Sequence, residues 1–305
     1  MADLVEFHRV GLEDRDQILA YLEDNPYCNC DYSFGNLYNW GFLYLTSVAF
    51  HKEMMLIRFR SFDTGNQAYL MPIGKGNLVE VLKDMEHTSK MEGHPLILMS
   101  VQDSAIELLE QTQPTSLKIF SNRDNADYLY DREKLETLSG KKLQSKRNHI
   151  NRFKRKYPDY TYEPISDENA NECIALENRW YADTETTPGM ADEREMVMKA
   201  LKEWKEIGLR GGCIRVEGKV VAFTLGMPIS HACFGVHIEK ADTDYDGSFT
   251  IINQEFVSHL PKQYVRINRE EDLGLEGLRK AKLSYQPMKI LEKHKVAISY
   301  EEDRV

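Results

Sequence analysis

The chain has 305 residues, of which 42% are hydrophobic and 29% are charged, so it can bury a sizeable core and is expected to divide into two domains. Its formal net charge of −10 argues against a general nucleic-acid binder unless positive charge is concentrated locally. Five cysteines, an odd number, suit a reducing compartment better than a disulfide framework.

The N-terminus lacks the apolar stretch of a signal peptide, and no apolar run has the length of a membrane-spanning helix. We therefore expect a soluble, cytoplasmic protein. Cys28 and Cys30 lie close together, but no second cysteine pair or paired histidine accompanies them, so we interpret them as buried thiols and predict no metal site.

The first half of the chain is predicted to be a sheet with helices. Helical periodicity alternates with short runs rich in β-branched and aromatic residues. Two of these strands are joined by a turn at residues 64–66. The predicted elements are helices over residues 13–24, 77–91 and 103–111, a strand pair within 53–74, and strands over 94–101 and 117–122.

Residues 140–157 carry eight Lys or Arg and no acid, a local reversal of the net charge. Their apolar residues share one helical face, so the segment is predicted to be an amphipathic helix. Lys146 falls inside the apolar arc and Arg147 on its edge, so we expect both to point into a cleft or to meet acids. Two interpretations stay open: a solvated basic face, or a surface for tRNA, an anionic headgroup or a phosphorylated cofactor. The candidate polyanion-binding residues are Lys142, Lys146, Arg147 and Arg152.

Prolines and turn residues at 157–169 predict a domain boundary, which we place between residues 1–160, ending in the basic helix, and 161–305. The second half repeats the order of elements in the first, and each half has a Met-Pro-Ile, at 71–73 and 227–229. This order predicts two similar α/β units in tandem. The predicted elements are helices near 168–182, 192–206 and 248–260 and within 273–283, a hairpin within 211–230, and strands over 231–240, 263–268 and 295–301.

An acidic turn precedes the helix at 248–260. Asp242, Asp244 and Asp246 have the spacing of a calcium loop, but its twelfth position is Asn253, and a strand rather than a helix leads into it. We therefore do not expect calcium. The helix start after Gly247 offers free N–H groups of the kind used in phosphate sites.

Residues 268–287 form a second dense stretch, in which Asn268 and Arg269 end a strand and Arg279 and Lys282 follow on a helix. Ligands collect at strand ends in α/β sheets, although a salt-bridged surface helix explains the pattern equally well. Walker, Rossmann, zinc-protease and nucleophile-elbow motifs are absent from the sequence. His237, in mid-strand, is interpreted as a hydrogen-bonded core histidine rather than a base.

Three segments together, at residues 127–153, 247–256 and 268–287, resemble the DUF2156 proteins that are grouped with the C-terminal catalytic domain of phosphatidylglycerol lysyltransferases. The resemblance covers nearly the whole chain. It implies an α/β fold of two tandem GNAT-like acyltransferase domains with mixed sheets flanked by helices, similar also to the Fem-type aminoacyltransferases. It further implies transfer of an acyl or aminoacyl group to an amine or hydroxyl.

In this resemblance, the strand at 233–239 is the central splayed strand, and the acidic turn replaces the glycine-rich pyrophosphate loop of ordinary GNAT enzymes. Each carboxylate close to a pyrophosphate would repel it by about 1 kcal/mol or more. The resemblance therefore favours aminoacyl-tRNA, held on the basic helix, over acyl-CoA as donor. Because no transmembrane segment is expected, we favour a small-molecule or peptide acceptor, with peripheral membrane contact through the basic helix as an open alternative.

The chemistry that the resemblance implies suggests roles for residues of the second half. Backbone N–H groups near Gly235 and Val236 are candidates for oxyanion stabilisation, and Glu239, Glu270 or Tyr285 for proton transfer. The competing hypotheses are a non-catalytic tRNA- or RNA-binding module and an ordinary acyl-CoA N-acyltransferase. The remaining candidates for holding phosphate or carboxylate are Gly247, Ser248, Asn268, Arg269, Arg279 and Lys282.

Overall fold

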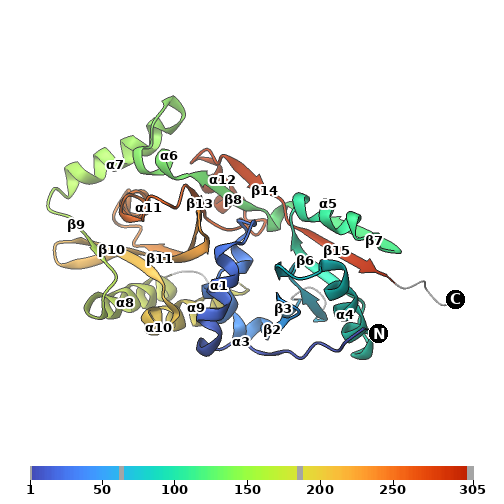
Figure 1. The fold of residues 1–305 in the computed structure, drawn as a ribbon. Helices are drawn as coiled ribbons and strands as arrows, with labels where there is room; N and C mark the ends of the chain where they lie inside the picture. Colours follow the sequence, from blue (N-terminus) through green and yellow to red (C-terminus); the bar gives the residue numbers. More distant parts are fainter. Residues whose placement is uncertain (1, 62–64, 184–187, 301–305) are drawn as a thin grey trace.

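The computed structural model describes residues 2–61, 65–183 and 188–300, which form two mixed sheets lying side by side with helices around them (Figure 1). The first sheet has the strand order β1-β2-β3-β4-β6-β15-β7, with β5 paired to β3. Its strands are β1 (His8–Arg9), β2 (Ser47–His51), β3 (Met54–Arg60), β4 (Gln67–Tyr69), β5 (Ile73–Gly74), β6 (Ile97–Val101), β7 (Ser116–Ser121) and β15 (His294–Ser299). The helices of this half are α1 (Arg15–Glu23), α2 (Phe34–Asn39), α3 (Gly41–Tyr44), α4 (Leu78–Met91) and α5 (Asp103–Gln111).

The second sheet has the order β14-β8-β13-β12-β11-β10-β9. Its strands are β8 (Asp127–Asp131), β9 (Thr161–Pro164), β10 (Arg210–Val216), β11 (Lys219–Ser230), β12 (Cys233–Ala241), β13 (Arg266–Asn268) and β14 (Lys289–Leu291). The helices are α6 (Arg132–Thr137), α7 (Gln144–Lys156), α8 (Asp167–Asp183), α9 (Met190–Lys202), α10 (Trp204–Ile207), α11 (Ser248–His259) and α12 (Glu276–Leu283). The region predicted as one helix over 192–206 is therefore divided at Glu203, which separates α9 from α10.

The two sheets have the same design. In each sheet, counted from β1 and from β9, the first four strands are antiparallel, and the fourth pairs in parallel with the fifth: β4 with β6, and β12 with β13. Two more strands follow in antiparallel pairing, β15 and β7 in the first sheet and β8 and β14 in the second. The inner strand of that last pair comes from the other half of the chain: β15 enters the first sheet and β8 the second. The predicted α/β fold class, two tandem units that each contain a mixed sheet flanked by helices, is confirmed, and the two units exchange one strand reciprocally.

Sheet membership changes at two places along the chain, between β7 and β8 and again between β14 and β15, where the C-terminal segment runs from one sheet to the other (Figure 1). The proline-containing segment near residue 160, predicted as the boundary, lies between α7 and β9, both in the second unit. Of the predicted turn at 64–66, Thr64 lies outside the described residues.

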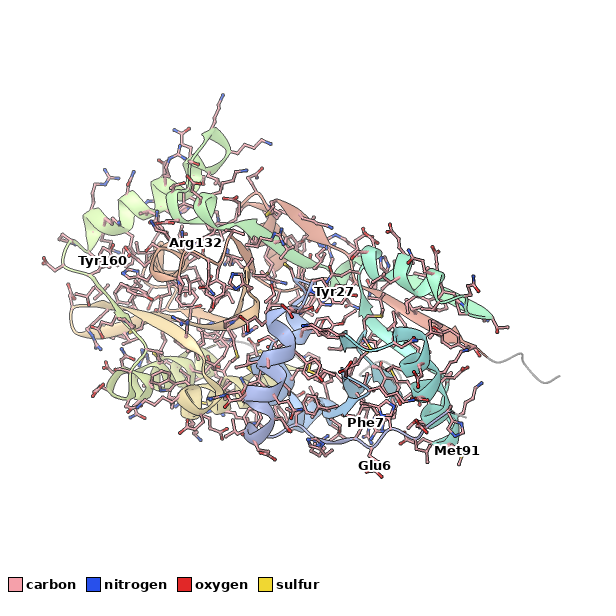
Figure 2. All side chains as sticks on the ribbon, in the orientation of Figure 1. Glu6, Phe7, Tyr27, Met91, Arg132 and Tyr160 are labelled. Carbon is pink, nitrogen blue, oxygen red and sulfur yellow. The ribbon has the colours of Figure 1, made fainter. Side chains whose placement is uncertain are left out.

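Helices cover both faces of the second sheet. α8 packs against β11 and β12 on one face, and α11, flanked by α6 and α7, packs against β10, β11 and β12 on the other (Figure 1). Arg132 of α6 donates to the carbonyl oxygens of Val257 and Leu260 and so caps the end of α11 (Figure 2).

One hydrophobic core is continuous between the halves. It includes Ile18 and Leu56 of the first half together with Phe223 and Ile238 of the second. A smaller core lies between the second sheet and α7 and α11. Among the described residues, no helix is long and apolar enough to cross a membrane.

Candidate active site

The parallel strands β12 and β13 pair over only a short length and then separate. They pair over three positions, ending with Gly235 opposite Asn268, and β12 then continues to Ala241 without β13 beside it. Beyond Gly235, the edge of β12 that faces β13 therefore has backbone groups without a strand partner. This opening is where Gly235 and Val236 were predicted to serve an oxyanion.

Two backbone irregularities flank the opening. β11 pairs Leu225 with Ile238 and Gly226 with Val236, so His237 is an extra, bulged residue on β12. On the other side, Glu270 follows β13 with a left-handed φ of 59°. Such a conformation costs a non-glycine residue about 1 kcal/mol or more and is concentrated at functional sites.

On the face toward α11, an ion pair bridges the opening. Arg269 Nη2 lies 2.8 Å from Glu239 Oε1, and Asn253 Nδ2 donates to Glu239 Oε2 at 3.2 Å. Among the described residues, the buried Arg269 Nη1 and Asn253 Oδ1 have no hydrogen-bond partner. Burial lowers the pKa of Arg269, but Glu239 and two tyrosines raise it by more than burial lowers it. The pKa is therefore above its ordinary value, and the guanidinium stays charged. One unused donor and one unused acceptor therefore lie beside the same carboxylate.

Tyr285 and Lys146 cover this ion pair. Arg269 lies 4.7 Å from the Tyr285 ring centroid, and Lys146 Nζ lies 4.0 Å from the same centroid. Partial burial, together with the positive charge of Arg269, lowers the pKa of Lys146 to about 8, although Glu239 opposes the shift. Burial raises the pKa of Tyr285, so its phenol stays protonated at neutral pH.

On the opposite face, a hydrogen-bonded chain runs from the second half into the first. His237 Nδ1 lies 2.7 Å from Glu270 Oε1, and His237 Nε2 lies 2.7 Å from Ser33 Oγ. Because an ionised carboxylate can only accept a hydrogen bond, we assign the ring proton of His237 to Nδ1, which donates to Glu270. The Ser33 hydroxyl then donates to Nε2. Asn36 Nδ2 also donates to Glu270 Oε1, at 2.9 Å. The predicted core histidine thus orients Glu270, whose side chain is 23% exposed.

Three predicted ligand-holding residues are occupied within the protein. Asn268 Nδ2 donates to Asp127 and to the carbonyl of Cys28, both at 2.6 Å. Arg279 pairs with Asp272 at 2.8 Å. Lys282 donates to the carbonyl oxygens of Arg269, at 2.5 Å, and of Glu271. These contacts hold the segment after β13 in position, because they tie it to the neighbouring strands and to α12.

The acidic turn and the basic helix are partly paired with each other. Gly247 has a left-handed φ of 94°, and Ser248 Oγ donates to the carbonyl of Asp242 at 3.0 Å. Asp246 pairs with Arg152 of α7 at 2.6 Å, and Asp242 with Lys219 at 3.0 Å. The pairing neutralises part of the charge that would repel a phosphate at this turn.

The outer side of α7 remains basic. An open groove of about 700 Å³ is lined by Asn148, Asn151, Arg152, Lys154 and Arg155. Figure 2 shows side chains along α7 extending away from the body of the protein. Lys142 is exposed, whereas Arg147 donates to the carbonyl oxygens of Leu138 and Gly140 and so closes the turn before α7.

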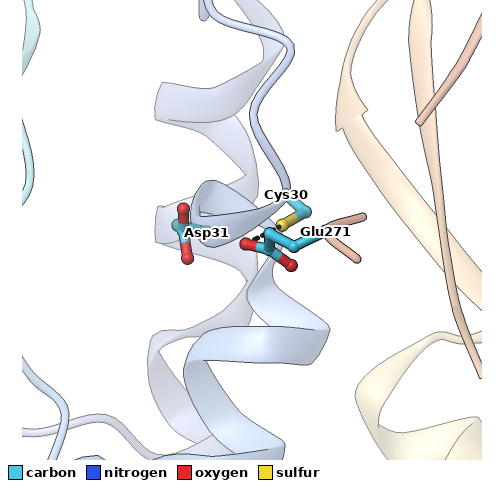
Figure 3. Close-up of side chains that lie close together, drawn as sticks. All are labelled: Cys30, Asp31 and Glu271. Carbon is cyan, nitrogen blue, oxygen red and sulfur yellow. Dashed lines mark hydrogen bonds between the residues drawn. The ribbon is translucent and has the colours of Figure 1, made fainter. Parts of the chain in front are cut away.

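A third polar cluster lies where the two halves meet. Cys30, Asp31 and Glu271 converge there (Figure 3). The buried ammonium of Lys293 contacts all three of these side chains. Lys293 Nζ lies 2.9 Å from Asp31 and 2.8 Å from Asp127, and it also contacts Glu271. Burial and the surrounding carboxylates raise the pKa of the Cys30 thiol. Side chains of the kinds that bind metals thus surround a lysine ammonium here.

The chain matches the family described as phosphatidylglycerol lysyltransferase, C-terminal, over residues 26–296, and it therefore belongs to this family. The resemblance found in the sequence is confirmed. A conserved protein of unknown function from Bacteroides thetaiotaomicron is 44% identical and superposes with a TM-score of 0.93, covering 97% of this chain and 100% of that one.

Two more distant structures share the fold. L-PGS from Bacillus licheniformis has a TM-score of 0.63 at 16% identity and covers 100% of this chain and 95% of its own. The C-terminal DUF2156 domain of a putative lysylphosphatidylglycerol synthetase from Agrobacterium fabrum has a TM-score of 0.65 at 14% identity, covering 94% and 91%. An uncharacterised protein of Mycoplasmoides gallisepticum is 26% identical over 179 residues, which span 58% of each chain.

Proposed function

We propose that this protein transfers an aminoacyl group to an amine or hydroxyl acceptor, with the reacting carbonyl held in the opening between β12 and β13. The observation that carries the proposal is the pair of unused groups beside Glu239, Arg269 Nη1 and Asn253 Oδ1. Acyl transfer builds negative charge on the carbonyl oxygen, which a buried guanidinium stabilises. An aminoacyl ester also carries an ammonium, which is a donor and therefore matches the free amide oxygen of Asn253.

Glu270 is the carboxylate best suited to accept the proton of the attacking group. Its side chain is partly exposed and is oriented by His237 and Asn36. Glu239, by contrast, is committed to Arg269, and the pKa of Tyr285 is raised by burial. In the reaction, the acceptor nitrogen or oxygen bonds to the carbonyl carbon and gives its proton to Glu270, while the ester bond breaks.

Lys146 is placed to protonate the leaving oxygen. Its ammonium lies over Tyr285 on the face that holds Arg269, and its pKa of about 8 makes proton donation near neutral pH favourable. For an aminoacyl-tRNA donor, the leaving oxygen is the ribose hydroxyl. Lys146 belongs to α7, so the same helix would hold the polyanion on its outer side and reach the ester with Lys146.

The basic groove also supports a second candidate function, a tRNA- or RNA-binding module that transfers nothing. This candidate needs only the groove on α7 and makes no use of the opening. Acyl-CoA as donor is a further alternative. Because two aspartates of the acidic turn are paired with cations, the turn would repel the pyrophosphate of CoA less than the sequence suggested.

Thermal unfolding with and without bulk tRNA, CoA or acetyl-CoA separates the donors, because a ligand well above its dissociation constant stabilises the folded protein by a few kcal/mol. We expect tRNA to raise the Tm at low salt and not at high salt. Arg155→Ala, in the groove, should reduce the shift, whereas the matched control Lys118→Ala, exposed on β7, should not. A shift with CoA alone would contradict the tRNA donor.

A further inference from the structure

Two thiols from different halves of the chain meet at the base of the opening. Cys28 directly follows Tyr27, near the junction of the halves (Figure 2), and Cys233 is the first residue of β12. Cys233 Sγ lies 3.8 Å from the carbonyl oxygen of Cys28, and the two thiols are close enough for each to shift the pKa of the other. They are 205 residues apart in the sequence.

A guanidinium makes this pair asymmetric. Arg266 Nη1 lies 3.5 Å from Cys28 Sγ. The neighbouring Cys233 thiol lowers the pKa of Cys28, burial opposes this, and Arg266 and Lys289 add positive charge, so the pKa falls to about 6. Cys233, whose pKa is raised, keeps its proton. A thiolate with a neighbouring thiol is the arrangement in which a first oxidation is resolved to a disulfide.

The other cysteines lie in different surroundings. Cys173 and Cys213 are also neighbours, but Cys213 faces the Glu163 carboxylate at 4.0 Å, and the Cys213 thiol together with burial raises the pKa of Cys173. Cys30 lies among carboxylates, and its pKa is raised as well. The second thiol pair is therefore an internal control in the same fold, because its nearby guanidinium, Arg215, is engaged by the carboxylates of Glu163 and Glu172.

We propose that Cys28 and Cys233 are an oxidation site, which a small hydroperoxide converts to a reversible disulfide between the two halves. The Cys28 thiolate attacks one peroxide oxygen, the O–O bond breaks, and the leaving oxygen takes up a proton, so Cys28 becomes a sulfenic acid. The Cys233 sulfur then attacks the Cys28 sulfur, and water leaves with the Cys233 proton. The two thiols lose two electrons in total, and the peroxide is reduced.

The disulfide would restrain the opening between β12 and β13. Cys28 is tied by its carbonyl to Asn268 Nδ2 at 2.6 Å, where β12 and β13 stop pairing. Cys233 begins the strand that carries Val236 and Glu239. The bond would therefore fix the first half to the start of both splayed strands. This proposal does not depend on the proposed transfer reaction, because it uses other residues and other chemistry.

The first test is alkylation of the folded, reduced protein with iodoacetamide across a pH series, followed by peptide mass spectrometry of each cysteine. We expect the rate at Cys28 to be half-maximal near pH 6. At pH 7 Cys28 should react at least about tenfold faster than Cys173, because its thiolate fraction is higher. Arg266→Gln, at an exposed position, should move the midpoint upward. In denaturant, all five cysteines should react alike.

The second test is oxidation with hydrogen peroxide. We expect a Cys28–Cys233 peptide that dithiothreitol releases, while Cys173 and Cys213 stay reduced. Cys233→Ser should leave a sulfenic acid on Cys28 that dimedone traps. If this variant fails to fold, Arg266→Gln serves instead and should slow formation of the disulfide. Equal alkylation of Cys28 and Cys173 in the folded protein, or no disulfide after peroxide treatment of the wild type, would overturn the proposal.

Discussion

Arg269 and Glu239 form an ion pair in a largely buried position, so each charge depends on the other. Their side chains are 12% and 14% exposed. Removing one member of such a pair leaves a buried charge without its counter-charge. The pair therefore connects stability with the proposed chemistry, since the same guanidinium presents the unused Nη1.

We expect Arg269→Met to lower the free energy of unfolding by about 3–5 kcal/mol, because Glu239 is left unpaired in the interior. Urea denaturation measures the change. Lys205→Met is the matched control, since Lys205 and Asp167 form an exposed pair that should contribute only about 0–1 kcal/mol. Equal effects of the two substitutions would show that the buried pair is not a stabilising contact.

Lys146→Met should raise the Tm at pH 7, because the wild type holds a charged lysine where burial and Arg269 disfavour it. The folded pKa, about 8, is below the ordinary value for lysine. Above pH 8 the unfolded chain therefore binds more protons than the folded chain, so wild-type stability gains with rising pH. The advantage of the variant should shrink from pH 7 to pH 10 in thermal melts. An advantage that does not change with pH would refute the lowered pKa.

The two sides of the proposed site differ in what the sequence indicates about them, and the roles of their residues stay predictions. Lys146 stood out because a cation inside an apolar helical arc needs a special environment, and Glu239 and Glu270 followed from their places on the splayed strand and after β13. Ser33 and Asn36 carried no such signal. Ser33 lies 204 residues from His237 in the sequence, so their contact arises only from the packing of the two halves.

At the scale of elements, the turn before α11 depends on a glycine. Gly247 has φ of 94°, and a Cβ there would lie 3.1 Å from the carbonyl oxygen of His149. We expect Gly247→Ala to lower the free energy of unfolding by about 1–2 kcal/mol and to loosen α7 from α11. Gly277→Ala is the control, because a Cβ at this position in α12 meets nothing within 4 Å. Chemical denaturation compares the two, and a neutral Gly247→Ala would contradict the strain argument.

Periodicity and apolar runs predicted most of the long elements. An amphipathic helix such as α4 shows its buried face in the sequence, and β11, which is buried along most of its length, shows a nearly continuous apolar run. It failed at β8, which was not predicted. β8 pairs with β13 and β14, which lie far along the chain: Asp131 is paired with Arg266, so no neighbouring segment identifies β8 as a strand. The prediction of one helix over 192–206 missed the break, because Glu203 is a good helix former and its side chain gives no signal of the interruption.

At the scale of the whole molecule, the exchange of β8 and β15 joins what the sequence suggested were two units in series. The two crossing points are bound to each other: Lys293, just before β15, pairs with Asp127, the first residue of β8, at 2.8 Å. Both side chains are almost fully buried. Neither sheet is complete without a strand from the other half.

We therefore expect a single cooperative unfolding transition, although the chain is long enough for two independent ones. Loss of either unit removes a strand from the other sheet and opens the shared core. In differential scanning calorimetry, the calorimetric enthalpy should equal the van't Hoff enthalpy. Two separable transitions would mean that the exchanged strands do not couple the halves.

The most direct test of the transferase account is to follow a radiolabelled aminoacyl group from bulk tRNA into a mixture of amine and hydroxyl acceptors, with wild type and Glu270→Gln compared. Thermal unfolding first establishes that the variant is folded. We expect label to reach an acceptor with the wild type, and Glu270→Gln to slow transfer by about 10²- to 10⁴-fold, because the proton acceptor is lost. Label that stays on the tRNA with the wild type, or equal rates for the two proteins, would contradict a transferase site between β12 and β13.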